Sequence, residues 1–300
     1  MLRCSGSFAG SRVRPDYAAA LRRYEALARR DDETIHARGG TILLGHGHPT
    51  ERAVVLFHGL TASPKQCGEL ARRLHACGDT VLVPRLPRHG ARDRLTTQLR
   101  DLRAHELIEA ADEALAIARG LGTAVTVAGF SLGGLLAAWL AQHEAVHHAV
   151  AIAPFLGVAR LHPRATPAFT AVLRALPNVF LWWNPLLRER LMPDHGYPRF
   201  PTRAIAEALG IANVLGALAR SSPPAARRIT IVTNTSETGV NNAAAHALAE
   251  AWRAHGAAEV ELAHITGLPP SHDVIEPLRP GTHARRAYRT LLPILHGERA

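Results

Sequence analysis

The chain alternates between short apolar runs and longer segments with helical spacing. The apolar runs are rich in small and β-branched residues, which is typical of strands buried on both faces; they occupy residues 41–44, 53–57, 80–83, 125–128, 149–152, 229–233 and 260–265. Helical patterns lie beside and between them, at residues 14–30, 63–77, 95–118, 132–144, 243–255 and 283–292. This alternation predicts an α/β fold with a mainly parallel sheet that carries helices on both faces.

Two segments fall outside the alternation. Residues 1–40 are predicted to form an N-terminal helical extension, and residues 41–300 an α/β domain with a cap inserted at about 155–205. Between Phe155 and Phe200 the chain carries seven of its 15 Phe, Trp and Tyr residues, with many prolines. A segment this long without regular alternation indicates either a lid over a ligand crevice or a helical subdomain whose aromatics pack on themselves. In both interpretations an apolar surface faces the crevice, and four aromatics are its predicted substrate-binding residues: Phe155, Trp182, Trp183 and Tyr197.

Composition narrows the possible partners. A chain of 300 residues with 47% apolar content can bury one substantial core. The net charge of +10 raises the question of nucleic acid. Nearly all of that charge is arginine, with Lys65 as the only lysine, and the arginines are spread along the chain. The densest cluster, at residues 85–94, has no interleaved aromatic on which a base could stack. We therefore expect no nucleic-acid partner and leave open a preference for anionic substrates near this loop.

The sequence also bears on location. No apolar run approaches the roughly 18 residues of a membrane span, and the first residues lack an apolar signal core. Cys4, Cys67 and Cys77 are odd in number and follow no metal-binding spacing. These features predict a cytoplasmic protein with free thiols, no transmembrane segment and no metal site. They leave the oligomeric state open.

The stretch VTVAGFSLGG at residues 125–134 holds the first candidate for chemistry. Ser131 lies between a predicted strand and a predicted helix, with Gly129 and Gly133 two positions away on either side. If the turn is sharp, side chains at those two positions would collide, so only glycine fits. The pattern G-x-S-x-G in this context is the nucleophile elbow, which presents a serine hydroxyl at the carboxyl end of a strand. The alternative is a glycine-rich turn in which Ser131 caps the helix.

A serine nucleophile needs a base, and the base needs an orienting carboxylate. His272 follows the last predicted strand in a loop rich in Gly and Pro, from which it can reach over the carboxyl edge of the sheet. Glu237 is the only acid in the loop after residues 229–233. Asp273 adjoins His272 and is not expected to fold back onto its neighbour's ring, so its removal should cost little activity. The alternatives are capping roles for His272 and Glu237.

An ester carbonyl under attack also needs N–H donors for its developing negative charge. One candidate is the backbone N–H of Leu132, directly after the serine. The other is that of Leu60, where the strand AVVLF runs into the loop HGLTAS. Gly59 lets this loop approach the substrate closely, and His58 is interpreted as structural.

With these residues in place, the chain resembles the α/β-hydrolase superfamily, in particular bacterial carboxylesterases and monoacylglycerol-lipase-like or serine-aminopeptidase-like hydrolases. The resemblance covers the chain from about residue 52 onward and rests on LFHGLTAS, VLVPRLPRHG, GFSLGG, SETGV and SHDVI in that order. It departs from the usual pattern in two ways: Glu237 stands where such esterases usually carry Asp, and Gly59 stands alone where others have HGGG.

The resemblance implies hydrolysis of carboxylic esters through an acyl-enzyme intermediate, with a Ser131, Glu237 and His272 triad and no cofactor. The expected substrate is a small-molecule ester with an apolar acyl or aromatic group. Two alternatives stay open: an amidase or peptidase on the same triad, and an inactive member that binds a small ligand beneath the cap.

Overall fold

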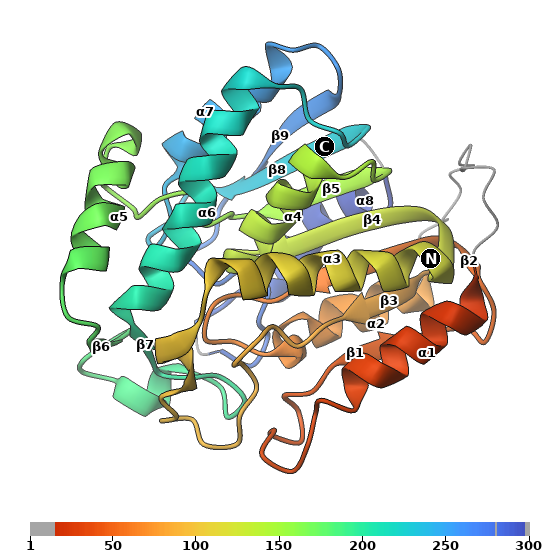
Figure 1. The fold of residues 1–300 in the computed structure, drawn as a ribbon, viewed down its shortest axis with the longest axis horizontal. Coiled ribbons are helices and arrows are strands. Elements are labelled where there is room, and N and C mark those ends of the chain that lie inside the picture. The colour runs from red at the N-terminus through yellow and green to blue at the C-terminus, as the bar shows by residue number, and fades with distance from the viewer. Residues whose placement is uncertain (1–15, 280, 298–300) are drawn as a thin grey trace.

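A single mixed sheet forms the centre of the computed structural model, which describes residues 16–279 and 281–297 (Figure 1). Within these residues its seven strands follow the order β1-β3-β2-β4-β5-β8-β9, and all neighbours are parallel except β1 and β3. The strands are β1 (Ile42–Leu44), β2 (Thr50–Phe57), β3 (Thr80–Val83), β4 (Gly122–Phe130), β5 (His148–Ile152), β8 (Arg228–Asn234) and β9 (Glu259–Ile265). The predicted α/β fold and all seven predicted strands are confirmed.

The middle of the sheet is buried on both faces. Val54, Val55, Val127 and Val150 are all fully buried, as expected of β-branched residues in parallel strands covered on both sides. The structure extends β4 to Phe130, so this central strand ends directly before Ser131. The candidate nucleophile therefore lies at the carboxyl edge of the sheet.

Helices cover the two faces (Figure 1). The helices α3 (Ala104–Leu121) and α4 (Leu132–His143) lie in front of the sheet in this view, while α2 (Gly68–Ala76) and α8 (Ala284–Leu295) lie behind it and contact each other. The helix α7 (Asn242–Arg253) packs on β8 and β9. Each was predicted, although the region predicted as one helix at 95–118 contains a loop, a short 3₁₀ turn at Gln98–Asp101 and then α3.

The segment predicted as a cap contains α5 (Thr166–Ala175) and an antiparallel pair, β6 (Phe180–Trp182) and β7 (Arg199–Pro201). The sequence prediction overlooked the helix that follows, α6 (Thr202–Ser221), which packs between α4, α5 and α7. Among the described residues it is the one helix long and apolar enough to cross a membrane, with a mean hydropathy of 1.2 over its most apolar stretch. Since 56% of that stretch is buried inside the protein, this is weak evidence for a membrane span.

The described part of the predicted N-terminal extension packs against the sheet domain. Its helix α1 (Tyr17–Ala28) lies along α3, and a Cβ on Gly120 would come within 2.6 Å of the Ala20 Cβ. Gly120 therefore allows the two helices to approach closely. Residues 1–15, including Cys4, lie outside the described residues, and the division into extension and domain stays a prediction.

Candidate active site

The turn at Ser131 is sharp and strained. Ser131 has φ 56° and ψ −111°, a backbone conformation that side-chain-bearing residues rarely adopt. A Cβ on Gly129 would lie 2.2 Å from the Gly133 carbonyl oxygen, and a Cβ on Gly133 would lie 2.0 Å from that of Phe57. Because these contacts are with backbone, neither position can hold a larger residue. The two glycines are therefore a steric requirement of the turn.

Backbone hydrogen bonds hold this turn against the next strand of the sheet. The N–H of Ser131 donates to the Ile152 carbonyl at 2.9 Å, and the Ser131 carbonyl accepts from Phe155 at 3.0 Å. Phe155, a predicted substrate-binding residue, is thus next to the serine; the residue is 8% exposed and is part of the core. The strain at Ser131 is balanced by bonds on both sides of the residue.

The three side chains predicted to converge lie within hydrogen-bonding distance. The Nε2 of His272 is 2.8 Å from the Ser131 Oγ, and its Nδ1 is 2.9 Å from the Glu237 Oε1. Ser131 comes from the end of β4, Glu237 from the loop after β8 and His272 from the loop after β9. The imidazole can thus accept the hydroxyl proton at one nitrogen while its other N–H donates to a carboxylate.

The Glu237 side chain is 2% exposed, and backbone N–H groups of its own loop donate hydrogen bonds to one of its two carboxylate oxygens. The Oε1 accepts from the backbone N–H groups of Thr238, Gly239 and Val240 at 2.8, 2.6 and 3.3 Å, besides His272. These donors stabilise the negative charge of a buried carboxylate. A Cβ on Gly239 would lie 2.9 Å from the His272 Cγ, so glycine at that position lets the ring pack against the loop.

Asp273 belongs to a different network from the array around His272. It is 2% exposed, and its Oδ1 accepts from the N–H groups of Ile275 and Glu276 at 3.1 and 3.0 Å. Its Oδ2 accepts from the Gln66 amide at 2.9 Å. The expectation that Asp273 does not orient its neighbour agrees with this geometry. The expectation that removal of Asp273 costs little activity does not agree with the geometry, because the Ile275, Glu276 and Gln66 donors would then be buried without an acceptor.

The loop after β2 presents the Leu60 N–H. His58 is fully buried, and burial lowers the pKa of its imidazole well below the usual value, so the ring is neutral. Its Nε2 accepts from the Leu86 N–H at 3.2 Å, which leaves Nδ1 to donate to the Gly59 carbonyl at 2.9 Å. That carbonyl also accepts from Ala62 at 3.2 Å. Because a trans peptide aims its N–H opposite to its C=O, these bonds orient the Leu60 N–H.

The other candidate donor is Leu132, the first residue of α4. Among the described residues, no backbone hydrogen bond uses the N–H of Leu60 or Leu132. The loop of Leu60 lies against the serine, since a Cβ on Gly59 would be 3.6 Å from the Ser131 Cβ. Both N–H groups are therefore free to receive a charged oxygen near Ser131, although their role as donors stays a prediction.

The cap aromatics have different surroundings. The Trp183 indole donates to the Thr61 Oγ1 at 2.8 Å, packs on Phe200 and is 39% exposed. Trp182 lies under the guanidinium of Arg188. Tyr197 is 2% exposed, and its hydroxyl accepts from the Ala91 N–H at 2.8 Å and donates to the Arg88 carbonyl at 3.2 Å. These bonds make Tyr197 an anchor of the cap; substrate binding by all four aromatics stays a prediction.

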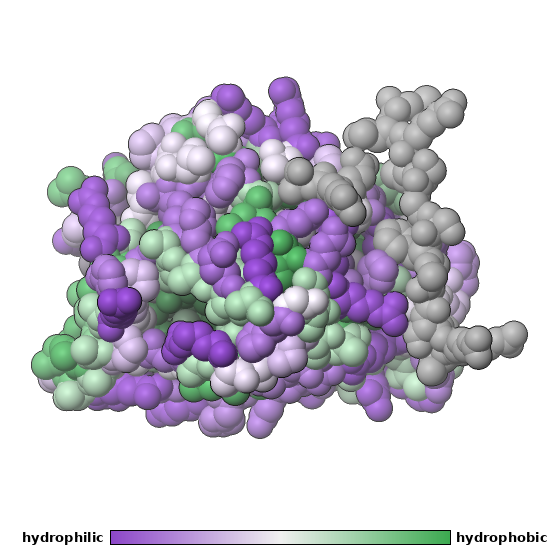
Figure 2. Space-filling model, turned by 90° about the horizontal axis from the view of Figure 1, so that it is seen from above, coloured by the Kyte–Doolittle hydropathy of each residue, from purple (hydrophilic) through white to green (hydrophobic). Residues whose placement is uncertain are grey.

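The outer cap exposes apolar side chains. Seen from above, hydrophobic residues gather at the left edge, the side on which α5 and β6 lie in Figure 1 (Figure 2). The large exposed hydrophobic residues of the cap are Val172, Leu176, Val179, Leu181, Trp183, Leu186 and Leu187.

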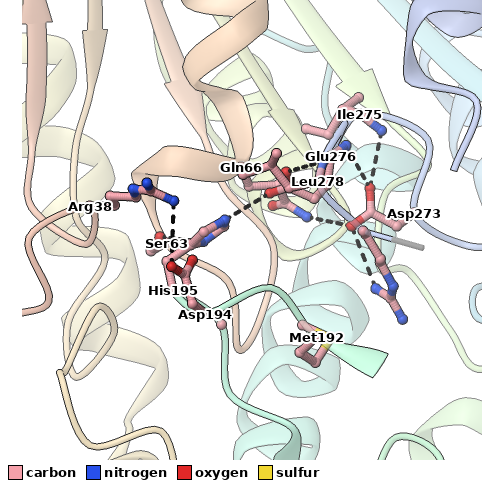
Figure 3. A network of polar contacts seen from close by, with 12 residues as sticks. Arg38, Ser63, Gln66, Met192, Asp194, His195, Asp273, Ile275, Glu276 and Leu278 are labelled. Carbon is pink, nitrogen blue, oxygen red and sulfur yellow. Dashed lines mark hydrogen bonds and ion pairs between the residues drawn. The ribbon is translucent and has the colours of Figure 1, made fainter. Parts of the chain in front are cut away.

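Sequence reasoning missed three buried polar residues beside the candidate site: Gln66, His195 and Glu276 (Figure 3). Gln66 follows the loop of Leu60, Glu276 follows His272, and His195 lies in the segment that returns from the cap. Gln66 and Glu276 lie near the motifs of Leu60 and His272 in the sequence, but nothing else in the sequence marks the three residues as part of the site. As to metals, no three His, Cys, Asp or Glu side chains of residues 16–279 and 281–297 are grouped as metal ligands would be.

A mainly parallel sheet with a strand, a strained serine turn and a helix at its carboxyl edge defines the α/β-hydrolase fold. The model of the alpha/beta hydrolase family matches residues 54–284, and the chain belongs to this family. No curated protein sequence matches this chain significantly.

Three solved structures illustrate the likeness. A structure described as "LipS and LipT, two metagenome-derived lipolytic enzymes" has a TM-score of 0.66 at 17% identity, covering 88% of this chain and 100% of that one. The Paleococcus ferrophilus monoacylglycerol lipase has a TM-score of 0.63 at 19% identity, covering 86% and 98%. A soluble variant of the Saccharomyces cerevisiae monoglyceride lipase also has 0.63, at 12% identity, covering 86% and 90%. At these identities the likeness establishes the shared fold.

Proposed function

We propose that this protein hydrolyses carboxylic esters through an acyl-enzyme intermediate. The observation that carries the proposal is the continuous hydrogen-bonded array from Ser131 through His272 to Glu237, at 2.8 and 2.9 Å, on a strained elbow. The lipases and esterases among the similar structures support the choice of ester hydrolysis over other reactions of the fold.

In the proposed first step, the His272 Nε2 takes the proton of the Ser131 hydroxyl while the Oγ attacks the ester carbonyl carbon. The negative charge moves to the carbonyl oxygen, which accepts hydrogen bonds from Leu60 and Leu132. Glu237 holds the ring and stabilises the imidazolium. When the tetrahedral intermediate collapses, the carbon–oxygen bond of the ester breaks and His272 gives its proton to the departing alcohol.

In the second step His272 takes a proton from water, whose oxygen attacks the acyl carbon of the Ser131 ester. Collapse releases the carboxylic acid and returns the proton to the Ser131 oxygen. No group beyond those of the protein and water enters this scheme.

We propose a small-molecule ester with an apolar acyl or aromatic group as the substrate. Phe155 lies beside the serine, and Trp183 is bonded to Thr61, next to the candidate oxyanion donor Leu60. An apolar group bound against such side chains would leave water, which favours binding by about 25 cal/mol per Å² of buried surface.

Labelling with a fluorophosphonate probe tests the proposed nucleophile. The wild-type protein should be labelled at Ser131 and should hydrolyse p-nitrophenyl esters, whereas Ser131→Ala should lose labelling and fall to a small residual rate. Ser236→Ala, in the loop after β8, is the matched control and should keep the label. An unlabelled wild-type protein would support the inactive, ligand-binding alternative.

The same protein can be given matched nitrophenyl esters and aminoacyl anilides. We expect faster turnover of the esters, because an alcohol leaving group demands less protonation than an amine. Faster turnover of the anilides would favour the amidase or peptidase alternative.

A further inference from the structure

A buried amide links the two loops that carry the candidate oxyanion donor and the candidate base. The Gly59 N–H donates to the Gln66 Oε1 at 2.8 Å. The Gln66 Nε2 in turn donates to the Asp273 Oδ2 at 2.9 Å (Figure 3). Gln66 is 4% exposed and Asp273 2%. Gly59 directly precedes Leu60, and Asp273 directly follows His272, so two hydrogen bonds connect one loop to the other.

The chemistry of the partners fixes the direction of this link. A backbone N–H can only donate and an ionised carboxylate can only accept, so the Gln66 amide fits between them in one orientation. Asp273 is itself held by its bonds from Ile275 and Glu276, and its Oδ2 also lies 3.5 Å from the Arg279 Nη1. The link is therefore a rigid spacer between the two loops.

We propose that Gln66 is a positioning residue for the oxyanion hole, holding the peptide of Leu60 at a set distance from His272 through Asp273. This inference rests on the proposed function, because it assumes that the Leu60 N–H receives the oxyanion. The Gly59 carbonyl, bonded to His58 and Ala62, sets the tilt of that peptide, and the Gln66 amide sets its position from the other side.

A second connection between the same regions should let the protein fold without this link. His195 of the cap contacts the Ser63 Oγ at 2.9 Å through Nδ1 and the Glu276 Oε2 at 3.2 Å through Nε2 (Figure 3). Ser63 and Glu276 lie near Leu60 and His272 along the chain. Loss of the Gln66 link should thus displace the donor by a small amount and leave the fold intact.

The expected kinetic effect falls on kcat. A hydrogen bond to the carbonyl oxygen strengthens when the charge develops, so a misplaced donor weakens the transition state more than the bound substrate. We expect a misplaced Leu60 donor to lower kcat about tenfold to a hundredfold, while KM changes less than about threefold.

Exchanging the two groups tests the link. In Gln66→Glu two carboxylates face each other, and in Asp273→Asn two amide NH₂ groups do, so each single variant should lose kcat. The double variant restores a matched pair, because the carboxylate introduced at position 66 can accept from both the Gly59 N–H and the amide introduced at position 273. It should recover to within about fivefold of the wild-type kcat, with the melting temperature measured for all four proteins.

A surface pair provides the matched control. Gln98 and Asp101 are both exposed, and Gln98→Glu with Asp101→Asn makes the same chemical changes away from the site. A double variant at 66 and 273 no faster than the slower single variant, or an effect confined to KM, would overturn the inference. So would a wild-type protein without esterase activity, which would overturn the proposed function as well. Normal wild-type activity with no rescue would overturn the link alone.

Discussion

At the scale of single residues, Glu237 and Asp273, the two buried acids near His272, have different partners. Glu237 contacts His272, whereas Asp273 contacts Gln66, Arg279 and the backbone of its own loop. The extra methylene of Glu237 fits a loop whose three N–H groups converge on one carboxylate oxygen. The sequence resemblance leads to the expectation of an aspartate at this position, and the structure shows that the Glu237 side chain reaches the imidazole.

Glu237→Gln tests this assignment. The amide oxygen can still accept from the loop and from His272, but the charge that stabilises the imidazolium is lost. The NH₂ group would also replace the Oε2, which is buried and has no hydrogen-bond partner among the described residues. We expect kcat for a p-nitrophenyl ester to fall about a hundredfold to ten-thousandfold.

Glu250→Gln is the control for that measurement, since the Glu250 side chain is 67% exposed on α7. It should leave kcat unchanged. If Glu237→Gln kept more than about a tenth of the wild-type rate, another group would have to orient His272.

At the scale of elements, the cap has an anchored side and an exposed side. The segment that returns from its outer part contacts three loops. Tyr197 is hydrogen-bonded to the loops after β2 and β3, and His195 is hydrogen-bonded to Ser63 after β2 and lies 3.2 Å from Glu276 after β9. Its outer part, with α5 and the turn after β6, exposes large apolar side chains. The anchored side therefore gives the candidate site a fixed wall.

Tyr197→Phe separates anchoring from substrate binding. The change removes two hydrogen bonds and leaves the Ala91 N–H buried without an acceptor, at a cost of about 1–3 kcal/mol in unfolding free energy. We expect the melting temperature to fall by several degrees, as measured by circular dichroism, and KM to stay unchanged. A higher KM at an unchanged melting temperature would instead favour the substrate-binding role.

Tyr24→Phe on α1 is the control, because it removes a phenol hydroxyl from a partly buried tyrosine that is distant from Tyr197 in the sequence. It should affect the melting temperature less than Tyr197→Phe does.

At the scale of the whole molecule, buried neutral histidines link stability to pH. Burial lowers the pKa of His148 to about 3, with Arg228 adding to the effect, and burial lowers the pKa of His89 to about 4. In the unfolded chain a histidine binds a proton below about pH 6.5. Protonation below that pH therefore favours the unfolded chain.

The free energy of unfolding should be at its full value above about pH 6.5 and fall as the pH drops toward 4. His148→Gln should reduce this slope, since it removes one of the groups that take up a proton on unfolding, and urea titrations at several pH values measure it. The exposed His48→Gln controls for the removal of a histidine as such. An unchanged slope in His148→Gln would show that His148 does not contribute.

The sequence by itself determined the strands, most of the helices and the three residues of the candidate array. Strands buried on both faces are rich in β-branched residues, and the sharp turn at Ser131 requires a glycine two positions away on each side. In a parallel sheet the carboxyl ends of all strands lie at one edge. Residues that follow strands therefore meet, which is how His272 and Glu237 could be chosen among many candidates. These signals are local, so they are readable without coordinates.

Only the tertiary structure decided the rest. The helix α6 escaped prediction because it packs against four other helices, α3, α4, α5 and α7, so its buried positions are spread around much of its circumference and leave no narrow apolar stripe. Gln66 and Asp273 are 207 positions apart, and nothing near either residue marks the other as its partner. Such contacts depend on the order of strands and on the path of the loops, which arise from packing the whole chain.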